Sequence, residues 1–178
     1  VSGNCASRDG GGISHWSDYG ADLHNVTIGA NRAGLRDGSP YKTGCLGEQI
    51  SVVITGRGGG IASWFPTTLE NSIVWGNWAQ TSGTEQIDTG NGALTASYSI
   101  IQNGSSFGTE HILTSDPNLS AAIGWSSAPS SAGNYRLEPD SPAIDAGDNT
   151  NVTEATDLDG NPRLIDDIAT TDTGLGTP

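Results

Sequence analysis

Three stretches of the chain share one pattern of apolar and polar positions. Each has a short β-branched core followed by a small or amide-bearing turn. The aligned cores are Val26-Thr27-Ile28, Ser72-Ile73-Val74 and Ser99-Ile100-Ile101. The second core begins 46 residues after the first (72 − 26) and the third begins 27 residues after the second (99 − 72). Apolar residues that alternate over such short cores predict β-strands.

A second motif repeats with nearly the same period. Gly10-Gly11-Gly12-Ile13 recurs as Gly58-Gly59-Gly60-Ile61, 48 residues later (58 − 10). Two independent motifs that recur at one period predict a repeat architecture. Because a further apolar run, Ile50–Ile54, falls inside the interval of 46, we expect that interval to hold two rungs of roughly 20–26 residues each.

Stacked rungs place β-branched side chains in continuous inward rows, because such residues fill a buried pleated surface. The candidates for these rows are Val26, Ile28, Val52, Ile54, Ile73, Val74, Ile100 and Ile101. From Ile87 to Ile101, Leu94 and Tyr98 are further inward candidates. Asn31 and Asn77 occupy equivalent turns, where stacked amides can hydrogen-bond from rung to rung. The alternative is that each is a solitary turn residue.

Composition and charge disfavour some classes of function. The formal net charge of −13, with only seven Lys and Arg, disfavours binding to nucleic acid. No apolar stretch approaches the ~18–20 residues of a membrane span, so we expect no membrane insertion. The chain starts at Val1, which is expected of a mature or excised piece of a longer protein.

Cys5 and Cys45 are either a disulfide pair or two buried thiols.

The pattern changes in the second half of the chain. Prolines at positions 139 and 142 forbid a helix there and favour an extended, turn-rich layer. We therefore divide the chain into β-helix rungs over residues 1–110 and an irregular, Pro- and Asp-rich capping region over residues 111–178. The overall prediction is an all-β fold, a right-handed parallel β-helix with an irregular C-terminal layer.

These motifs carry a family resemblance. The Gly-Gly-Gly-Ile repeat, the rung at residues 71–77 and Tyr98–Gln102 resemble right-handed parallel β-helix proteins of large bacterial surface polypeptides. The run through Asp116-Pro117, residues 135–137, 141–147 and 157–163 resembles the choice-of-anchor Q type. Such proteins are similar to the pectate-lyase-like superfold and to the passengers of polymorphic outer-membrane proteins. The resemblance implies a secreted or cell-surface location, and a terminal strand beyond Pro178 that this sequence lacks.

An acidic cluster near the C-terminus is the candidate metal site. Its members supply the hard oxygen ligands that calcium prefers, and they are Asp145, Asp148, Asp157, Asp159 and Asn161. Asp157, Asp159 and Asn161 follow the alternate spacing of a calcium loop, but Pro162 stands where glycine is expected. The alternative is a set of Asx-turns without metal. Calcium is thus a candidate ligand and no other cofactor is expected.

Aromatic residues are the candidate carbohydrate contacts, because their faces stack on sugar rings while their edges stay hydrated. They are Trp16, Tyr19, Trp64, Trp75 and Trp78, with Phe65 beside them. Packing under loops would explain the same residues equally well.

Catalysis has weaker support in the sequence. β-Helix lyases need a cation and a basic residue, and hydrolases need paired carboxylates. The charged residues of candidate cleft loops are Asp18, Asp22, Arg32, Arg36, Asp37 and Lys42. They form no distinctive motif, and His15, His24 and His111 lack metal-ligand spacing. We expect a non-catalytic surface module for adhesion, carbohydrate contact or scaffolding, with a polysaccharide lyase or glycoside hydrolase as the alternative.

The ends of the stack suggest a further partner. A repeat stack must cover its terminal strands, since an uncovered strand offers free backbone N–H and C=O groups. We expect the Pro-rich region, residues 116–165, to cover the C-terminal end, but nothing comparable precedes Gly10. We therefore also expect head-to-tail self-association of the chain.

Overall fold

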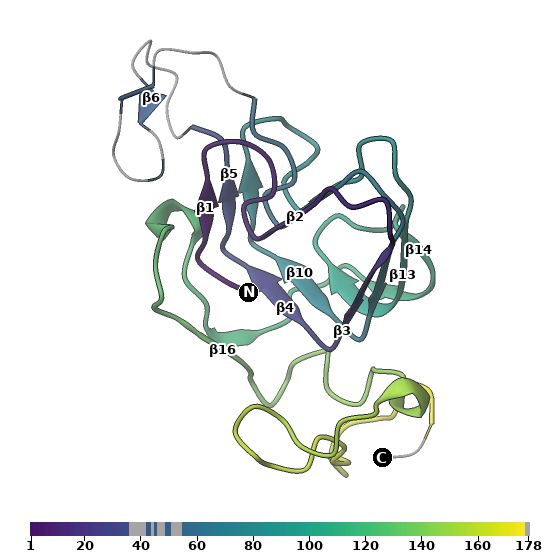
Figure 1. Ribbon diagram of the computed structural model, residues 1–178. Helices are drawn as coiled ribbons and strands as arrows, with labels where there is room; N and C mark the ends of the chain where they lie inside the picture. Colours follow the sequence, from purple (N-terminus) through teal and green to yellow (C-terminus); the bar gives the residue numbers. More distant parts are fainter. Residues whose placement is uncertain (36–41, 44, 46–48, 51–54, 177–178) are drawn as a thin grey trace.

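The computed structural model describes residues 1–35, 42–43, 45, 49–50 and 55–176. Within these residues the protein is all-β, and its helical elements are two short 3-10 turns, η1 (Trp125–Ser127) and η2 (Asn149–Asn151). Most strands belong to three sheets that are parallel throughout (Figure 1).

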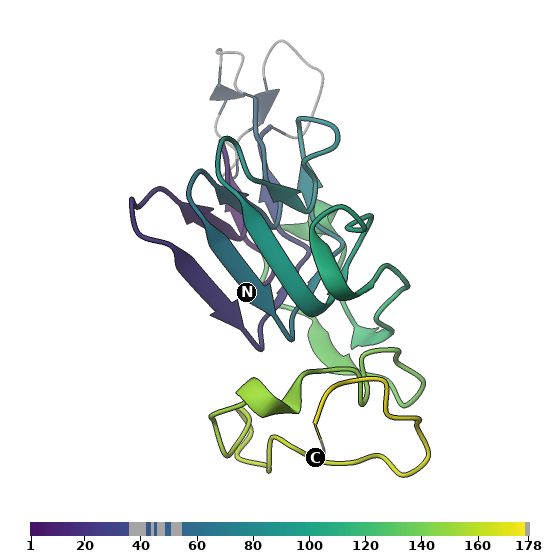
Figure 2. The same ribbon diagram turned by 90° about the vertical axis from the view of Figure 1, so that its right-hand side faces the viewer.

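The chain visits the three sheets in a fixed order. Sheet C contains β2 (Ile13–His15), β8 (Ile61–Ser63) and β12 (Ile87–Asp88). Sheet A contains β3 (Ala21–His24), β4 (Thr27–Gly29), β9 (Thr67–Glu70), β10 (Ile73–Trp75), β13 (Leu94–Ile101) and β14 (Gly108–Leu113). Sheet B contains β1 (Cys5–Ala6), β5 (Arg32–Ala33) and β11 (Trp78–Ala79). The first two passes run from C through A to B, and the third runs from C to A. In sheet A, β3 and β4 of the first pass therefore lie beside β9 and β10 of the second, and β13 of the third pass follows (Figure 2).

The register agrees with the alignment of the three cores. Ile73 of β10 pairs with Thr27 and Ile100, and Val74 pairs with Ile28 and Ile101. Ile13 pairs with Ile61, as the glycine motif predicts. The glycines allow a close backbone approach, since a Cβ on Gly11 would lie 2.4 Å from the Gly59 carbonyl oxygen.

The expectation of two rungs within the interval of 46 residues is wrong. β4 pairs directly with β10, so the interval makes a single pass. The extra length is an insertion, in which β6 (Lys42–Thr43) and β7 (Gln49–Ile50) pair with each other and not with the three sheets. Val52 and Ile54, two of the expected inward residues, lie outside the described residues.

The core is formed by one face of each sheet. Its buried members are Ile28, Ile61, Leu69, Val74, Ile87, Ala96 and Ile101. Ile73 and Ile100 point to the opposite face of sheet A because successive strand residues alternate. Tyr98 is not an inward residue either, since it occupies a corner with a φ of 45° and is half-buried.

Asn31 and Asn77 are stacked, as predicted, and belong to a longer row of amides. Asn31 Nδ2 donates to Asn77 Oδ1 at 2.9 Å. On one side Asn4 Nδ2 donates to Asn31 Oδ1 at 3.0 Å. On the other, Asn77 Nδ2 donates to Gln86 Oε1 at 2.8 Å and Gln86 Nε2 donates to Gln102 Oε1 at 3.0 Å. We call these five side chains the amide ladder.

The C-terminal residues form an irregular layer against the outer face of sheet A. It begins with the antiparallel pair β15 (Leu119–Ala121) and β16 (Asn134–Leu137) and continues mostly as turns. β14 extends three residues past the expected boundary at position 110. Asn71 fastens the layer to the sheet, because its side chain donates to the Asp148 carbonyl at 2.8 Å and accepts from the Asp148 N–H at 2.7 Å.

A disulfide joins Cys5 of β1 to Cys45, with 5.6 Å between the Cα atoms. Of the two alternatives for these cysteines, the structure contains the bonded one. The bond ties the insertion to sheet B and closes a separation of 40 residues.

Candidate functional site

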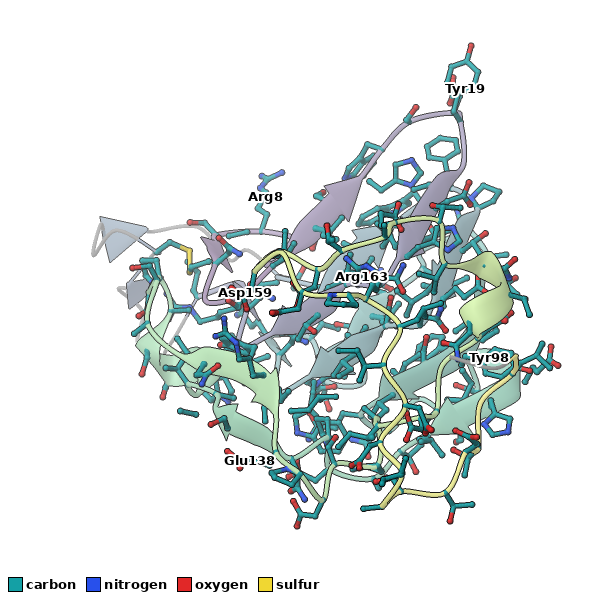
Figure 3. The ribbon with its side chains drawn as sticks, turned by 90° about the horizontal axis from the view of Figure 1, so that it is seen from below. Arg8, Tyr19, Tyr98, Glu138, Asp159 and Arg163 are labelled. Atoms are coloured by element: carbon teal, nitrogen blue, oxygen red, sulfur yellow. A yellow bond between two sulfur atoms is a disulfide. The ribbon has the colours of Figure 1, made fainter. Side chains whose placement is uncertain are left out.

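Among the described residues, the most exposed aromatic side chains lie at the corner between sheets C and A. Trp16 follows β2 and Trp64 follows β8, and because these strands pair in register the two indoles stack, with centroids 4.0 Å apart and planes inclined by 20°. Trp16 is 63% exposed, and Tyr19, in the same corner of the first pass, is 83% exposed. Figure 3 shows Tyr19 projecting away from the strands.

The stack is held from several sides. Trp16 Nε1 donates to Ser14 Oγ at 3.1 Å. Gly90, on the third pass, packs so closely on Trp64 that a Cβ there would lie 2.6 Å from Trp64 Nε1. Gly90 therefore packs on Trp64 and Trp64 packs on Trp16, and the Trp16 indole at the end of this row is exposed. The sequence held a signal for this pairing, since Trp16 and Trp64 are separated by the same 48 residues (64 − 16) as the glycine motifs.

The other two predicted aromatics lie elsewhere. Trp75 ends β10 and is half-buried. Trp78 of β11 stacks on Trp125 of η1, with centroids 5.0 Å apart and planes inclined by 18°. Sequence reasoning missed Trp125, because nothing in the periodic pattern connects η1 with β11. The structure thus stacks Trp16 on Trp64, places Tyr19 in the same loop as Trp16, and holds Trp75 and Trp78 on other strands.

The residues considered for catalysis do not converge in the described part of the chain. Arg32 is 3% exposed, and its Nε and Nη2 donate to Cys5 Sγ at 3.1 and 3.0 Å. Asp18 and Asp22 are exposed on the first pass. Arg36, Asp37 and the side chain of Lys42 lie outside the described residues.

Two of the expected calcium ligands, Asp148 and Asp157, accept hydrogen bonds within their own turns. Asp148 accepts from the Thr150 N–H at 2.8 Å and from Asn151 Nδ2 at 3.0 Å. Asp157 accepts from the backbone N–H groups of Asp159 and Asn161, at 2.9 and 2.8 Å.

These turn contacts have electrostatic consequences. Hydrogen bonds from Asn161 hold the pKa of Asp157 below its usual range. Asp159 is paired with Arg136. This geometry corresponds to the Asx-turn alternative for Asp148 and Asp157.

Asp145 has different neighbours. Its carboxylate lies with those of Asp166 and Asp172, all within 4.8 Å of one another, the one such acidic group among the described residues. Burial raises the pKa of Asp145, and the nearby carboxylates add to this effect. Asp166 and Asp172 are exposed.

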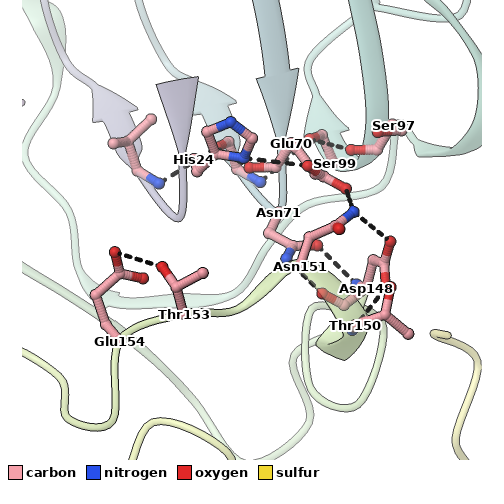
Figure 4. A network of polar contacts seen from close by, with 12 residues as sticks. His24, Glu70, Asn71, Ser97, Ser99, Asp148, Thr150, Asn151, Thr153 and Glu154 are labelled. Carbon is pink, nitrogen blue, oxygen red and sulfur yellow. Dashed lines mark hydrogen bonds and ion pairs between the residues drawn. The ribbon is translucent and has the colours of Figure 1, made fainter. Parts of the chain in front are cut away.

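A polar network links the first two passes to the C-terminal layer (Figure 4). His24 Nδ1 lies 3.1 Å from Glu70 Oε2, and Asn151 Nδ2 donates to Glu70 Oε1 at 2.8 Å. Because each carboxylate oxygen of Glu70 has a partner and its residue is 8% exposed, this group stabilises the junction between β9 and η2.

Two adjoining cavities lie between sheet A and the C-terminal layer. Their volumes are about 150 and 380 Å³, and Ile73, Leu137 and Ala143 line both. Tyr98 and His111 line the smaller one and stack at 5.2 Å, each with positive φ. The ionisable residues that line them are Tyr98 and His111 in the smaller cavity and Asp145 and Arg163 in the larger one, and neither lining contains a pair of carboxylates.

Comparison with known proteins identifies no relative. No protein-family model, curated protein or solved structure matches the chain. Within the described residues, no helix is long and apolar enough to span a bilayer.

Proposed function

We propose that the three parallel sheets are the faces of a right-handed parallel β-helix, and that the chain is a non-catalytic, secreted or cell-surface module that contacts carbohydrate. The C-to-A-to-B order of the first two passes, the shared register and the amide ladder support the β-helix. The disulfide supports an oxidising, extracellular environment. The motifs that resemble bacterial choice-of-anchor Q proteins agree with both.

The stacked pair Trp16–Trp64 carries the carbohydrate proposal. An indole that packs in the protein interior is covered on both faces, whereas Trp16 is covered on one face and 63% exposed. The ring is also fixed before a ligand arrives, by Ser14 on its edge and Trp64 on its face. Preorganisation of this kind removes part of the entropic cost of binding.

The charge of the chain narrows the class of sugar. A net charge of −13 repels polyuronates, so we propose a neutral polysaccharide. A pyranose with equatorial hydroxyls presents a flat C–H face to the indole and leaves its hydroxyl edges in water. Tyr19 offers a second aromatic surface in the same corner.

The test is binding to a panel of soluble neutral and acidic oligosaccharides, followed by Trp fluorescence and calorimetry. We expect Trp16→Ala to weaken binding about tenfold, which corresponds to about 1.4 kcal/mol. Trp125→Ala is the matched control, because it removes an indole from the other stacked pair.

Two results would count against the proposal. If Trp125→Ala abolished binding and Trp16→Ala did not, the wrong aromatic pair would have been assigned. If the protein released reducing ends or unsaturated products, the alternative function, a polysaccharide lyase or glycoside hydrolase, would replace the binding module.

A further inference from the structure

The outer edge of β3 is a free strand edge. Among the described strands β3 pairs with β9 alone. The Ala21 N–H donates to the Pro66 carbonyl at 3.0 Å, and the Asn25 N–H donates to the Glu70 carbonyl at 3.1 Å. Because backbone groups alternate in direction along a strand, the N–H and C=O groups of Asp22 and His24 point away from β9. They are therefore available to another strand.

The edge also carries apolar surface. Asp22 and His24 are exposed, while Leu23 lies between them, half-buried against the core. Ile13 and Val26, also on the first pass, are likewise only partly buried. An edge of this kind is a template for pairing with a further strand.

The two ends of the stack differ in shape. At the N-terminal end residues 1–3 pair with β4 and β1 pairs with β5, which leaves β3 as the strand of sheet A whose outer edge is free. At the other end β14 adds a fourth level to sheet A, whereas sheets B and C stop at three. A contact at the N-terminal end therefore uses the edge of β3 and not all three sheets at once.

We propose that β3 pairs antiparallel with β3 of a second copy of this chain, across a two-fold axis at Leu23. Leu23 then lies opposite Leu23 of the second copy, on the core side of the sheet. Asp22 lies opposite His24 of the second copy, and His24 opposite its Asp22. These last two positions have outward backbone groups, so they form the hydrogen-bonded pairs of the ladder.

Charge complementarity supports the second copy as the partner. The two-fold axis brings an Asp22 carboxylate and a His24 imidazole together twice on the outer face, where an imidazole N–H can donate to the carboxylate. Glu70 holds His24 through Nδ1 at 3.1 Å, which leaves Nε2 for the incoming Asp22. A self-complementary contact of this kind closes as a dimer and does not propagate.

The experiment is sedimentation velocity over a range of protein concentrations, in about 0.15 M salt to screen the net charge. We expect a monomer–dimer equilibrium for the unmodified chain. Asp22→Arg replaces the carboxylate opposite His24 with a guanidinium, which cannot accept a hydrogen bond from the imidazole, and should weaken the dimer about tenfold or more. Asp140→Arg makes the same charge change at another exposed position and should leave the dimer intact.

Mixing two variants tests the register. His24→Asp alone places two carboxylates opposite each other and should also give monomers. An equimolar mixture of Asp22→Arg and His24→Asp chains places a carboxylate opposite a donor in both pairs, so the dimer should return. Circular dichroism checks that each variant is folded.

Three results would overturn the proposal. The first is a monomer at every concentration, and the second is a dimer that Asp22→Arg leaves unchanged. The third is growth into assemblies larger than a dimer, which would indicate the head-to-tail contact that the sequence suggested.

Discussion

Removing one amide from the middle of the amide ladder tests whether it holds the passes together. Asn77 is 5% exposed. Its Nδ2 donates to the Ile28 carbonyl at 2.9 Å and to Gln86 Oε1 at 2.8 Å. Its Oδ1 accepts from the Asn31 backbone N–H at 3.0 Å and from Asn31 Nδ2 at 2.9 Å. Asn77→Ala therefore removes four hydrogen bonds at one site.

The groups that lose a hydrogen bond to Asn77 differ in whether they keep another partner. Asn31 Nδ2 keeps the Val1 carbonyl as a partner, and Gln86 Oε1 keeps the backbone N–H of residue 77. The Asn31 N–H is left without its acceptor in a residue that is fully buried. An unsatisfied buried group costs about 1–3 kcal/mol, and each ordinary hydrogen bond contributes about 0.5–1.5 kcal/mol. We therefore expect Asn77→Ala to lower the free energy of unfolding by about 3–4 kcal/mol.

Asn4 provides the matched control, because it is an exposed asparagine at the end of the same ladder. Asn4→Ala removes a donor to Asn31 Oδ1, but that oxygen keeps the backbone N–H of residue 4. We expect a loss of about 0.5–1 kcal/mol. Both free energies come from denaturant unfolding with the disulfide intact, and an unchanged m-value shows that the difference lies in stability. Equal losses in the two variants would refute the argument, because they would show that burial does not set the cost.

Two further predictions concern the C-terminal layer. Asn71→Gly keeps the left-handed backbone (φ 50°) but deletes the side chain that holds Asp148. We expect faster limited proteolysis of residues 138–176 with little change in the β-sheet signal; unchanged cleavage would show that Asn71 does not fasten the layer. Because burial raises the pKa of Asp145 in the folded state, the folded protein binds that proton more tightly, and the carboxylate destabilises the fold as pH rises. Asp145→Asn should therefore raise Tm at neutral pH, with the difference shrinking as pH falls toward about 4, and a constant difference across this range would exclude the cause.

The sequence predicted the register well because the repeat has a simple physical origin. Ile28, Val74 and Ile101 occupy one inward row, and a change of one residue in any pass would turn that strand's apolar side chain outward. The same logic predicted the contact between Asn31 and Asn77. It failed for the interval between them, because an apolar run such as Ile50–Ile54 looks like a rung wherever it occurs.

The site was less accessible to the same reasoning. The stack of Trp16 on Trp64 follows from the period of 48 residues, but period alone does not reveal which indole keeps a free face. Trp125 reaches Trp78 through an irregular segment that has no period. The path of the turns also brings Asp145 close to Asp166 and Asp172, and the spacing of these residues in the sequence does not predict that contact.

The length of each pass explains why the two ends of the stack differ. From His24 to Glu70, its partner in β9, the chain takes 46 residues (70 − 24), whereas from Ser97 to Glu110, its partner in β14, it takes 13 (110 − 97). Thirteen residues cannot supply strands to sheets B and C as well, so the last pass returns directly to sheet A and Phe107 packs against the end of the core. No short return of this kind covers β3, so the outward N–H and C=O groups of this edge strand have no partner strand among the described residues. Because β14 covers β13 at one end of sheet A while the outer edge of β3 stays free at the other, that edge is suited to pair with its equal, which favours a closed pair over a filament.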